Sequence, residues 1–177
     1  GSASRSSAMG ALALCLVQME SEITSSSHSE ISMQKASQVA RLGSGSASRS
    51  LFPDYSLWGK TELWKGSSDE YAIPVQNYHE TFRNLRDRIL IVESGQKRIS
   101  SSVGHSLMKD HPFAIKRFDQ ARDNLKLLQR AFIEGNWKSF ISVVEEEALS
   151  LHAMMLTSKP GFILMQPGTL SIMHKIR

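Results

Sequence analysis

The residues best suited to chemistry form a run of small polar side chains with one arginine, Gly43-Ser44-Gly45-Ser46-Ala47-Ser48-Arg49-Ser50. Glycines allow backbone N–H groups to approach a phosphate closely, and serine hydroxyls add further hydrogen-bond donors. Arg49 offers a planar guanidinium that binds a phosphate or a carboxylate through two hydrogen bonds. If residues 48–50 begin a helix, its positive N-terminal end would add to the site. The run therefore predicts an anion site, with a flexible Gly/Ser loop as the alternative.

Two further clusters have the same chemistry. Gly1–Ala8 precedes a helix expected over Ala8–Glu22, so its serines and Arg5 would lie near a positive helix N-terminus. A ragged chain end is the alternative there. The third cluster, Lys97–Gly104, follows an expected strand. Three donor clusters favour a ligand that carries several phosphates, whereas the absence of a Walker A lysine pattern and of GxGxxG excludes the P-loop and Rossmann motifs.

Other reactive residue types give weaker signals. The six histidines lack metal-ligand spacing, so no protein metal site is expected. His152 lies beside the apolar face of its expected helix and is interpreted as structural. The single cysteine, Cys15, lies in an apolar helical run and is expected to be inert core, and one cysteine cannot form an intramolecular disulfide.

The helices and strands that position these residues are predicted from the spacing of apolar residues and from the residues that end helices and strands. A second helix is expected over about 30–42, capped by Ser29 or a neighbouring serine. Strands and hairpins are expected between Tyr55 and Val75, a buried strand over Arg88–Glu93, and a short helix over Ile99–Lys109.

A helical hairpin is expected in the second half of the chain. Apolar residues recur at helical spacing over 115–132 and again over 137–155, with Gly135 as a stop and Asn136 as a new N-cap. A last helix is expected over Thr169–Arg177. Because the strands cluster between helical stretches, the predicted fold class is α+β.

Length and composition narrow the function classes. The chain has 177 residues, which is long enough for one domain of ordinary size or two small ones, and its formal charge is +4. Its longest apolar run, Ala11–Val17, is far shorter than the roughly 18 residues of a membrane span. The small basic excess is scattered, which argues against nucleic-acid binding. A cytoplasmic enzyme or binding protein is therefore expected, without a membrane or nucleic-acid partner.

Ala40–Leu51, followed by Trp58, resembles the A-R-x-G-S-G-S-A-C-R-S-L signature of the diphosphomevalonate decarboxylases, a family of the GHMP kinase superfamily. Ser48 replaces the cysteine of that signature. Gly1–Ala8 resembles the superfamily motif G-[LI]-A-S-S-A-S-A, with Arg5 in place of its second loop serine, and Lys97–Gly104 resembles a K-x-x-S-S-x-x-G stretch.

The resemblance implies a GHMP-kinase-like two-domain α+β fold, with both domains incomplete. Residues 1–86 would be the rest of a ribosomal protein S5 domain 2-like N-terminal domain that binds ATP and substrate. Residues 87–177 would begin a ferredoxin-like C-terminal domain with the helical hairpin. The family's lysine/tyrosine/tryptophan segment is expected before Gly1, and its catalytic aspartate, in a D-A-G-x-N loop, after Arg177. The chain thus looks like the central part of such an enzyme.

The family uses ATP and Mg²⁺ to convert 5-diphosphomevalonate to isopentenyl diphosphate in isoprenoid biosynthesis. Two other interpretations remain open: a catalytically silent phosphate-binding or packing module, and a mevalonate 3-kinase or phosphomevalonate decarboxylase relative. Members are often homodimers, so a homodimer is possible here. Carried over position by position, the resemblance makes Arg49 and Ser101 catalytic, Ser44, Gly45, Ser46, Arg49 and Ser101 substrate-binding, and Ala3, Ser4 and Arg5 the ATP phosphate site.

Overall fold

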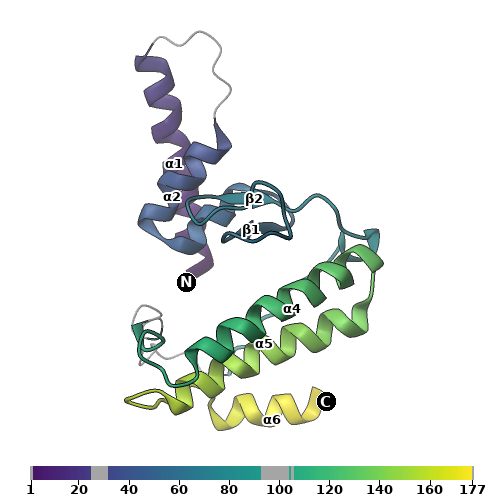
Figure 1. Ribbon diagram of the computed structural model, residues 1–177. Helices are drawn as coiled ribbons and strands as arrows, with labels where there is room; N and C mark the ends of the chain where they lie inside the picture. Colours follow the sequence, from purple (N-terminus) through teal and green to yellow (C-terminus); the bar gives the residue numbers. More distant parts are fainter. Residues whose placement is uncertain (1, 25–31, 93–103, 105, 177) are drawn as a thin grey trace. The chain divides into compact units, whose positions relative to one another are not determined.

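The computed structural model describes residues 2–24, 32–92, 104 and 106–176, and the side chains of α1 from residue 6 onward (Figure 1). The chain divides into two compact units, Gly1–Tyr78 and His79–Arg177. This boundary lies before the one expected between residues 86 and 87, and the assignment of 1–86 and 87–177 to two family domains stays a prediction.

The first unit contains two helices that pack side by side, α1 (Ser2–Ile23) and α2 (Met33–Gly43). The α2 prediction is confirmed within the described residues, and its N-cap is Ser32, whose Oγ accepts from the Lys35 amide at 3.3 Å. The expected start of the first helix near Ala8 is wrong, because α1 already includes Ser2. Ser6, in one of these extra turns, is buried, and its hydroxyl is hydrogen bonded to that of Ser46 in η1.

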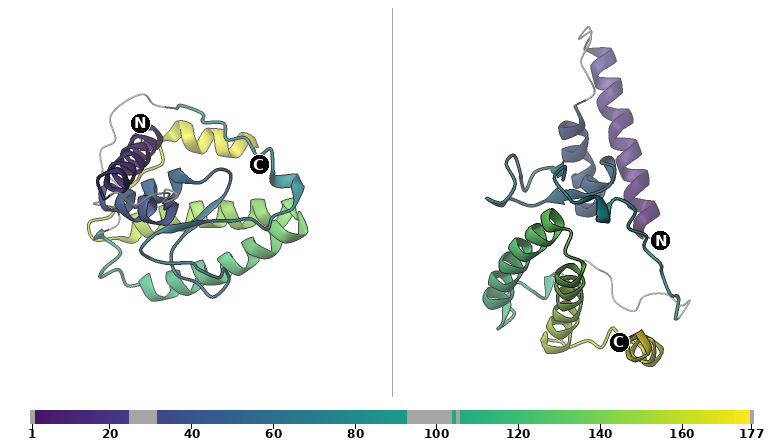
Figure 2. Two further views of the ribbon diagram at one scale, coloured as in Figure 1. Left: turned by 90° about the horizontal axis from the view of Figure 1, so that it is seen from above. Right: turned by 90° about the vertical axis from the view of Figure 1, so that its right-hand side faces the viewer.

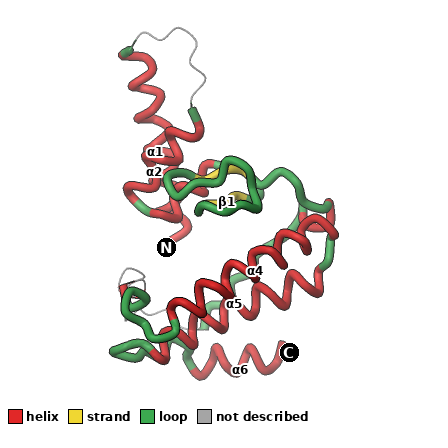
Figure 3. Tube along the Cα trace, viewed as in Figure 1, coloured by secondary structure: helices red, strands yellow, loops and turns green. Residues whose placement is uncertain are grey.

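A short 3₁₀ helix, η1 (Gly45–Leu51), follows α2 and leads into two strands. Strands β1 (Ser56–Trp58) and β2 (Ala72–Pro74) pair antiparallel, with Trp58 opposite Ala72. The hairpin expected between residues 55 and 75 is therefore confirmed, although its strands are short and most of the intervening segment is loop (Figure 3).

The core of the first unit is made of small side chains. Ala13 of α1, Ala40 of α2 and Ala47 of η1 are at most 2% exposed and meet one another. Met9, Val39 and Leu51 pack around them. Cys15 is exposed, so its expected place in the core is wrong. A residue two positions after Ala13 is turned about 200° around the helix axis, which directs it away from that core.

The second unit is mainly helical and contains η2 (Glu80–Phe82), α4 (Ala114–Glu134), α5 (Trp137–Thr157) and α6 (Pro167–Ile176). The expected hairpin is confirmed, and α4 and α5 run side by side in all views (Figure 2). Gly135 ends α4 at a φ of 70°, the left-handed region that favours glycine. Asn136 caps α5, and its Oδ1 accepts from the Ser139 amide at 3.0 Å.

Aromatic rings form the interior of the hairpin. Phe82 is 0% exposed, and its ring centroid lies 5.0 Å from those of Phe132 and Phe140 and 4.7 Å from that of Trp137. Such clusters add edge and offset ring contacts to the burial of apolar area. These rings join η2 to the α4–α5 connection.

A polar cluster links α4 and α5. The Arg117 guanidinium pairs with the Glu147 carboxylate, which also accepts from Asn124 Nδ2 at 2.8 Å. Partial burial raises the pKa of Glu147, but hydrogen bonds from Arg117 and Asn124 and the Arg117 charge outweigh it, so the net pKa is lowered.

The strand expected over 88–93 is wrong in its described part, because residues 88–92 form no strand (Figure 3). Within the described ranges no segment pairs with them, and Ile89 and Ile91 remain about four-fifths exposed. A strand requires a hydrogen-bonding neighbour, which local sequence does not supply. Of the helix expected over 99–109, residues 99–103 and 105 lie outside the described residues, and 107–110 form a turn.

The last helix is confirmed, although α6 begins at Pro167 rather than Thr169. In the residues that the structure describes, no helix combines the length and apolar character needed to cross a membrane.

Candidate functional site

The predicted anion-binding run forms a turn and a 3₁₀ helix on the surface of the first unit. Ser44 ends α2 in an extended conformation, with its amide donating to the Ala40 carbonyl at 3.1 Å, and η1 begins at the next residue. Most of the run is therefore in ordered secondary structure, which contradicts the alternative of a flexible Gly/Ser loop.

The two glycines of this run allow close packing. A Cβ on Gly43 would collide with the Met9 side chain. A Cβ on Gly45 would lie 2.6 Å from Cη2 of Trp58. The Trp58 indole is fixed there because its Nε1 donates to the Asp69 carbonyl at 2.9 Å. Gly45 is required because the indole occupies the space of a side chain.

Three serine hydroxyls form a line at the start of η1. The Ser6 and Ser46 hydroxyls are hydrogen bonded at 2.7 Å, and those of Ser44 and Ser46 at 3.2 Å. Ser6 belongs to the first predicted donor cluster, whereas Ser44 and Ser46 belong to the second. The fold thus joins two clusters that lie 40 residues apart in the chain. Ser46 is exposed, so its hydroxyl is accessible to a ligand.

Arg49 lies on the same short helix with its side chain exposed. Among the residues described, no carboxylate forms an ion pair with its guanidinium. Its backbone is held in place, because its carbonyl accepts from Ser56 Oγ at 3.2 Å and from the Phe52 amide at 3.3 Å. The result is a solvent-facing cation on an ordered backbone, on the same short helix as Ser46.

Buried serine hydroxyls form hydrogen bonds with the backbone of η1. Ser48 is 0% exposed, and its Oγ donates to the Gly45 carbonyl at 2.7 Å. The serine that replaces the signature cysteine is thus accommodated by a local hydrogen bond. Ser37 of α2 is also 0% exposed and contacts the Ser48 backbone.

Sequence reasoning did not single out Ser37. The available signal was a serine beside the apolar helix positions Ala36 and Ala40, since a polar group on a buried face needs hydrogen-bond partners. It could not identify those partners.

Arg41, the second residue of the signature, has a structural role because its guanidinium contacts Glu70. Its Nε donates to the Glu70 carbonyl at 2.9 Å, and a terminal guanidinium nitrogen lies 3.0 Å from Glu70 Oε2. This pair fastens the end of α2 to the segment before β2.

The structure describes the remaining predicted site residues only in part or not at all. Ala3, Ser4 and Arg5 lie in the first turns of α1, where the backbone alone is described. Ser101 and nearly all of Lys97–Gly104 lie outside the described residues. The described part of the site is therefore Ser6, Ser44, Gly45, Ser46 and Arg49.

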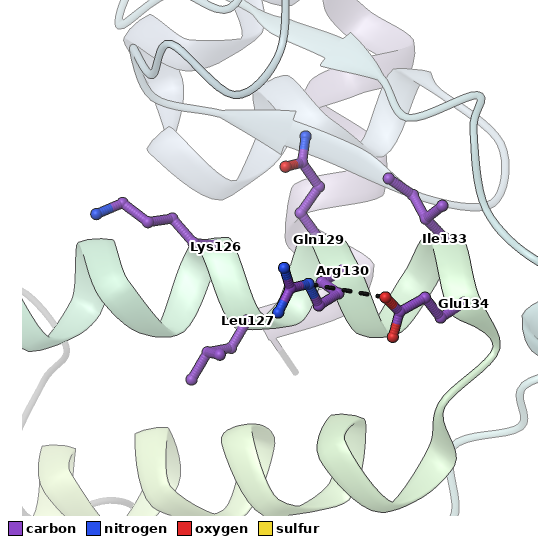
Figure 4. Close-up of a pocket in the computed structure, with 6 residues that line it drawn as sticks. All are labelled: Lys126, Leu127, Gln129, Arg130, Ile133 and Glu134. Atoms are coloured by element: carbon purple, nitrogen blue, oxygen red, sulfur yellow. Dashed lines mark ion pairs between the residues drawn. The ribbon is translucent and has the colours of Figure 1, made fainter.

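The second unit provides no comparable anion site in its described part. A surface hollow along α4 is lined by six residues, and its Arg130 is paired with Glu134 at 3.7 Å (Figure 4). None of the predicted site residues lines it; its lining is Lys126, Leu127, Gln129, Arg130, Ile133 and Glu134.

Two observations concern the possible metal-binding groups and the role of His152. In the described ranges, no three His, Cys, Asp or Glu side chains are grouped so that they could hold a metal ion. His152 is half-buried, and its buried Nδ1 has no hydrogen-bond partner in the part of the chain that the structure describes.

Comparison with known proteins shows what this chain is similar to. Residues 1–72 match the family model described as diphosphomevalonate decarboxylase-like N-terminal domain. This match lies within the first unit, and the α+β fold is similar to that of GHMP-family decarboxylases.

Particular relatives extend the likeness into the second unit. Diphosphomevalonate decarboxylase of Candida albicans is 27% identical over 146 residues, which are 81% of this chain and 40% of that protein. The crystal structure of a mevalonate diphosphate decarboxylase from Legionella pneumophila is 29% identical, with a TM-score of 0.73, over 95% of this chain and 49% of that one.

A third match concerns a ligand-bound structure and shows the fold alone. It is described as MDDEF in complex with MVAPP, AMPPCP and magnesium, is 24% identical, and has a TM-score of 0.66 over 82% of this chain and 44% of that one. The resemblance drawn from the sequence is confirmed: the chain is similar to the diphosphomevalonate decarboxylases in sequence and in fold. It spans less than half the length of the relatives that it matches.

Proposed function

We propose that the protein carrying this chain catalyses the ATP-dependent decarboxylation of 5-diphosphomevalonate to isopentenyl diphosphate in the mevalonate pathway. The observation that carries the proposal is that the exposed Arg49 lies on the same short helix as Ser46, whose hydroxyl is hydrogen bonded to that of Ser44. The substrate is an anion with a carboxylate and a diphosphate, and both are groups that arginine and hydroxyl donors recognise. The names of the relatives support the same activity.

Arg49 would hold the substrate carboxylate through two parallel hydrogen bonds. A carboxylate fixed in this way keeps its C–C bond oriented for loss of CO₂, and such positioning contributes to the rate. Ser44, Gly45 and Ser46 would bind the substrate beside it, and Ser101 would contact the transferred phosphate and the substrate diphosphate.

ATP phosphates require N–H and O–H donors, and the N-terminal end of α1 would supply them. Ala3, Ser4 and Arg5 lie at the N-terminal end of α1, where backbone N–H groups are free of intrahelical partners. Mg²⁺ is usually bound together with substrate phosphates, so nucleotide phosphate oxygens would supply part of its coordination. ATP and Mg²⁺ correspond to the AMPPCP and magnesium named for the MDDEF structure, which are ligands of that protein.

The cytoplasmic location and the homodimer expected from the sequence and the resemblance belong to this proposal and stay predictions.

The test is turnover by the complete gene product, with ATP, Mg²⁺ and diphosphomevalonate, followed by release of CO₂ and phosphate. Arg49→Ala should lower kcat/KM by about 10²-fold or more, because a bidentate charged contact is worth roughly 3 kcal/mol. Arg49→Lys should recover only part of this loss, since an ammonium lacks the planar fork. Lys60→Ala, which removes an exposed cation of the same unit, is the matched control.

The alternatives give different results. A mevalonate 3-kinase would phosphorylate mevalonate without releasing CO₂, and a phosphomevalonate decarboxylase would prefer the monophosphate. A silent module would show no turnover with any of the three substrates. Near-normal kinetics of Arg49→Ala would refute the role given to this arginine.

A further inference from the structure

Ser37 lies at the centre of the first unit, where its single hydroxyl joins three elements. Its Oγ donates to the Ser48 carbonyl of η1 at 2.9 Å and accepts from the Ala72 amide of β2 at 2.9 Å. The residue is 0% exposed, so water does not compete for either bond. One hydroxyl on α2 therefore serves two buried backbone groups on different segments.

The carbonyl that Ser37 holds lies in the residue directly before Arg49. In a 3₁₀ helix of seven residues, a shift of one peptide group moves its neighbours with it. On the other side, Arg49 is restrained by the bonds from Ser56 Oγ and the Phe52 amide to its carbonyl. The backbone around Arg49 is thus held by Ser37 on its buried side and by Ser56 and Phe52 on its other side.

We propose that Ser37 is a positioning residue for substrate binding: its hydroxyl sets the place of η1 on α2 and β2, and thereby directs Arg49 at the substrate carboxylate. The inference rests on the function proposed for Arg49. An alanine at this position, like its neighbours Ala36 and Ala40, would pack equally well but would leave a buried N–H and a buried C=O without this partner.

A purely structural serine and a positioning serine have different kinetic consequences. Loss of stability alone lowers the fraction of active protein, so it reduces the apparent kcat and leaves KM unchanged. Displacement of Arg49 weakens the contact with the substrate, so it raises KM for diphosphomevalonate while KM for ATP changes little.

The experiment measures both KM values of the complete gene product and its variants, at a temperature where circular dichroism shows each to be folded. Ser37→Ala should raise KM for diphosphomevalonate about tenfold, since small displacements of a positioning group have large effects. The KM for ATP should stay within about twofold, because the changed contact is at the carboxylate.

Two replacements at the same position separate hydrogen bonding from volume. Ser37→Thr keeps the hydroxyl and should return KM to within about threefold of the unmodified value. Ser37→Cys fills a similar volume with a weak donor and should resemble Ser37→Ala, and it keeps the test open if the alanine variant does not fold. Val17→Ala, at a buried α1 position that is 6% exposed, should lower stability without changing either KM.

The possible failures differ from one another. If the unmodified protein releases no CO₂, the proposed function is refuted, and this inference is refuted with it. If the unmodified protein is active but Ser37→Ala behaves like Val17→Ala, with an unchanged KM, the inference alone is overturned.

Discussion

Around Ala47 the interior of the first unit consists of alanines and hydrogen-bonded serines, whereas around Phe82 the interior of the second unit consists of aromatic rings. Short side chains allow backbone segments to approach closely, and the peptide groups buried between them then need partners such as Ser37. Aromatic rings supply more apolar area.

This difference accords with the place of the candidate site. An anion site needs backbone and hydroxyl groups at defined positions, and a core of small residues with buried hydrogen bonds provides them near Arg49. The aromatic unit holds a helical hairpin whose polar contacts, such as Arg117 with Glu147, tie one helix to the other. We therefore expect substitutions in the two cores to have effects of different kinds.

The largest effect on stability is expected at Phe82. Phe82→Ala should lower the free energy of unfolding by about 3–5 kcal/mol, because it removes a fully buried ring and leaves a cavity. Urea denaturation measures this change. Phe118→Ala, at an α4 position that is 48% exposed, is the control and should cost much less. Equal losses in the two variants would show that the aromatic cluster does not stabilise the unit.

A smaller effect is expected at Gly45, where the first unit depends on the absence of a side chain. Gly45→Ala should cost about 1–3 kcal/mol, because the new methyl group collides with the Trp58 indole. Tryptophan fluorescence should change as the ring moves. Gly10→Ala adds the same methyl where the nearest atom is 3.4 Å away, in the interior of α1, so it should be neutral or stabilising. If both variants were equally stable, close packing at Gly45 would not matter.

The smallest effect is expected at the α4–α5 ion pair and depends on pH. Because the folded pKa of Glu147 lies below its ordinary value of 4.5, its contribution is fully present above that pH. The contribution is lost as the pH falls through the folded value. Glu147→Gln should therefore cost about 1 kcal/mol or less at pH 7 and flatten the loss of stability below pH 4.5.

Urea denaturation from pH 7 to pH 3 measures this pH dependence. Asp110→Asn, at an exposed turn position, should keep the acid-induced loss seen in the unmodified protein. An unchanged pH profile in Glu147→Gln would show that this carboxylate does not contribute to the difference between the two cores.

The amino-acid sequence alone determined the features that depend on neighbouring residues. Gly135 and Asn136 predict the end of one helix and the start of the next, because left-handed conformations and N-caps are local preferences. The signature around Arg49 indicated the resemblance to the diphosphomevalonate decarboxylases in the same way, since its residues follow one another along the chain.

Only the tertiary structure decided which distant groups meet. It brought Ser6 to Ser46, Ser37 to Ser48 and Ala72, and the Trp58 indole to Gly45. It also left residues 88–92 without a strand partner in the described ranges, although their composition favours a strand. Hydrogen bonds and packing between residues far apart in the chain depend on how the whole unit folds, and periodicity within a short window carries no information about them.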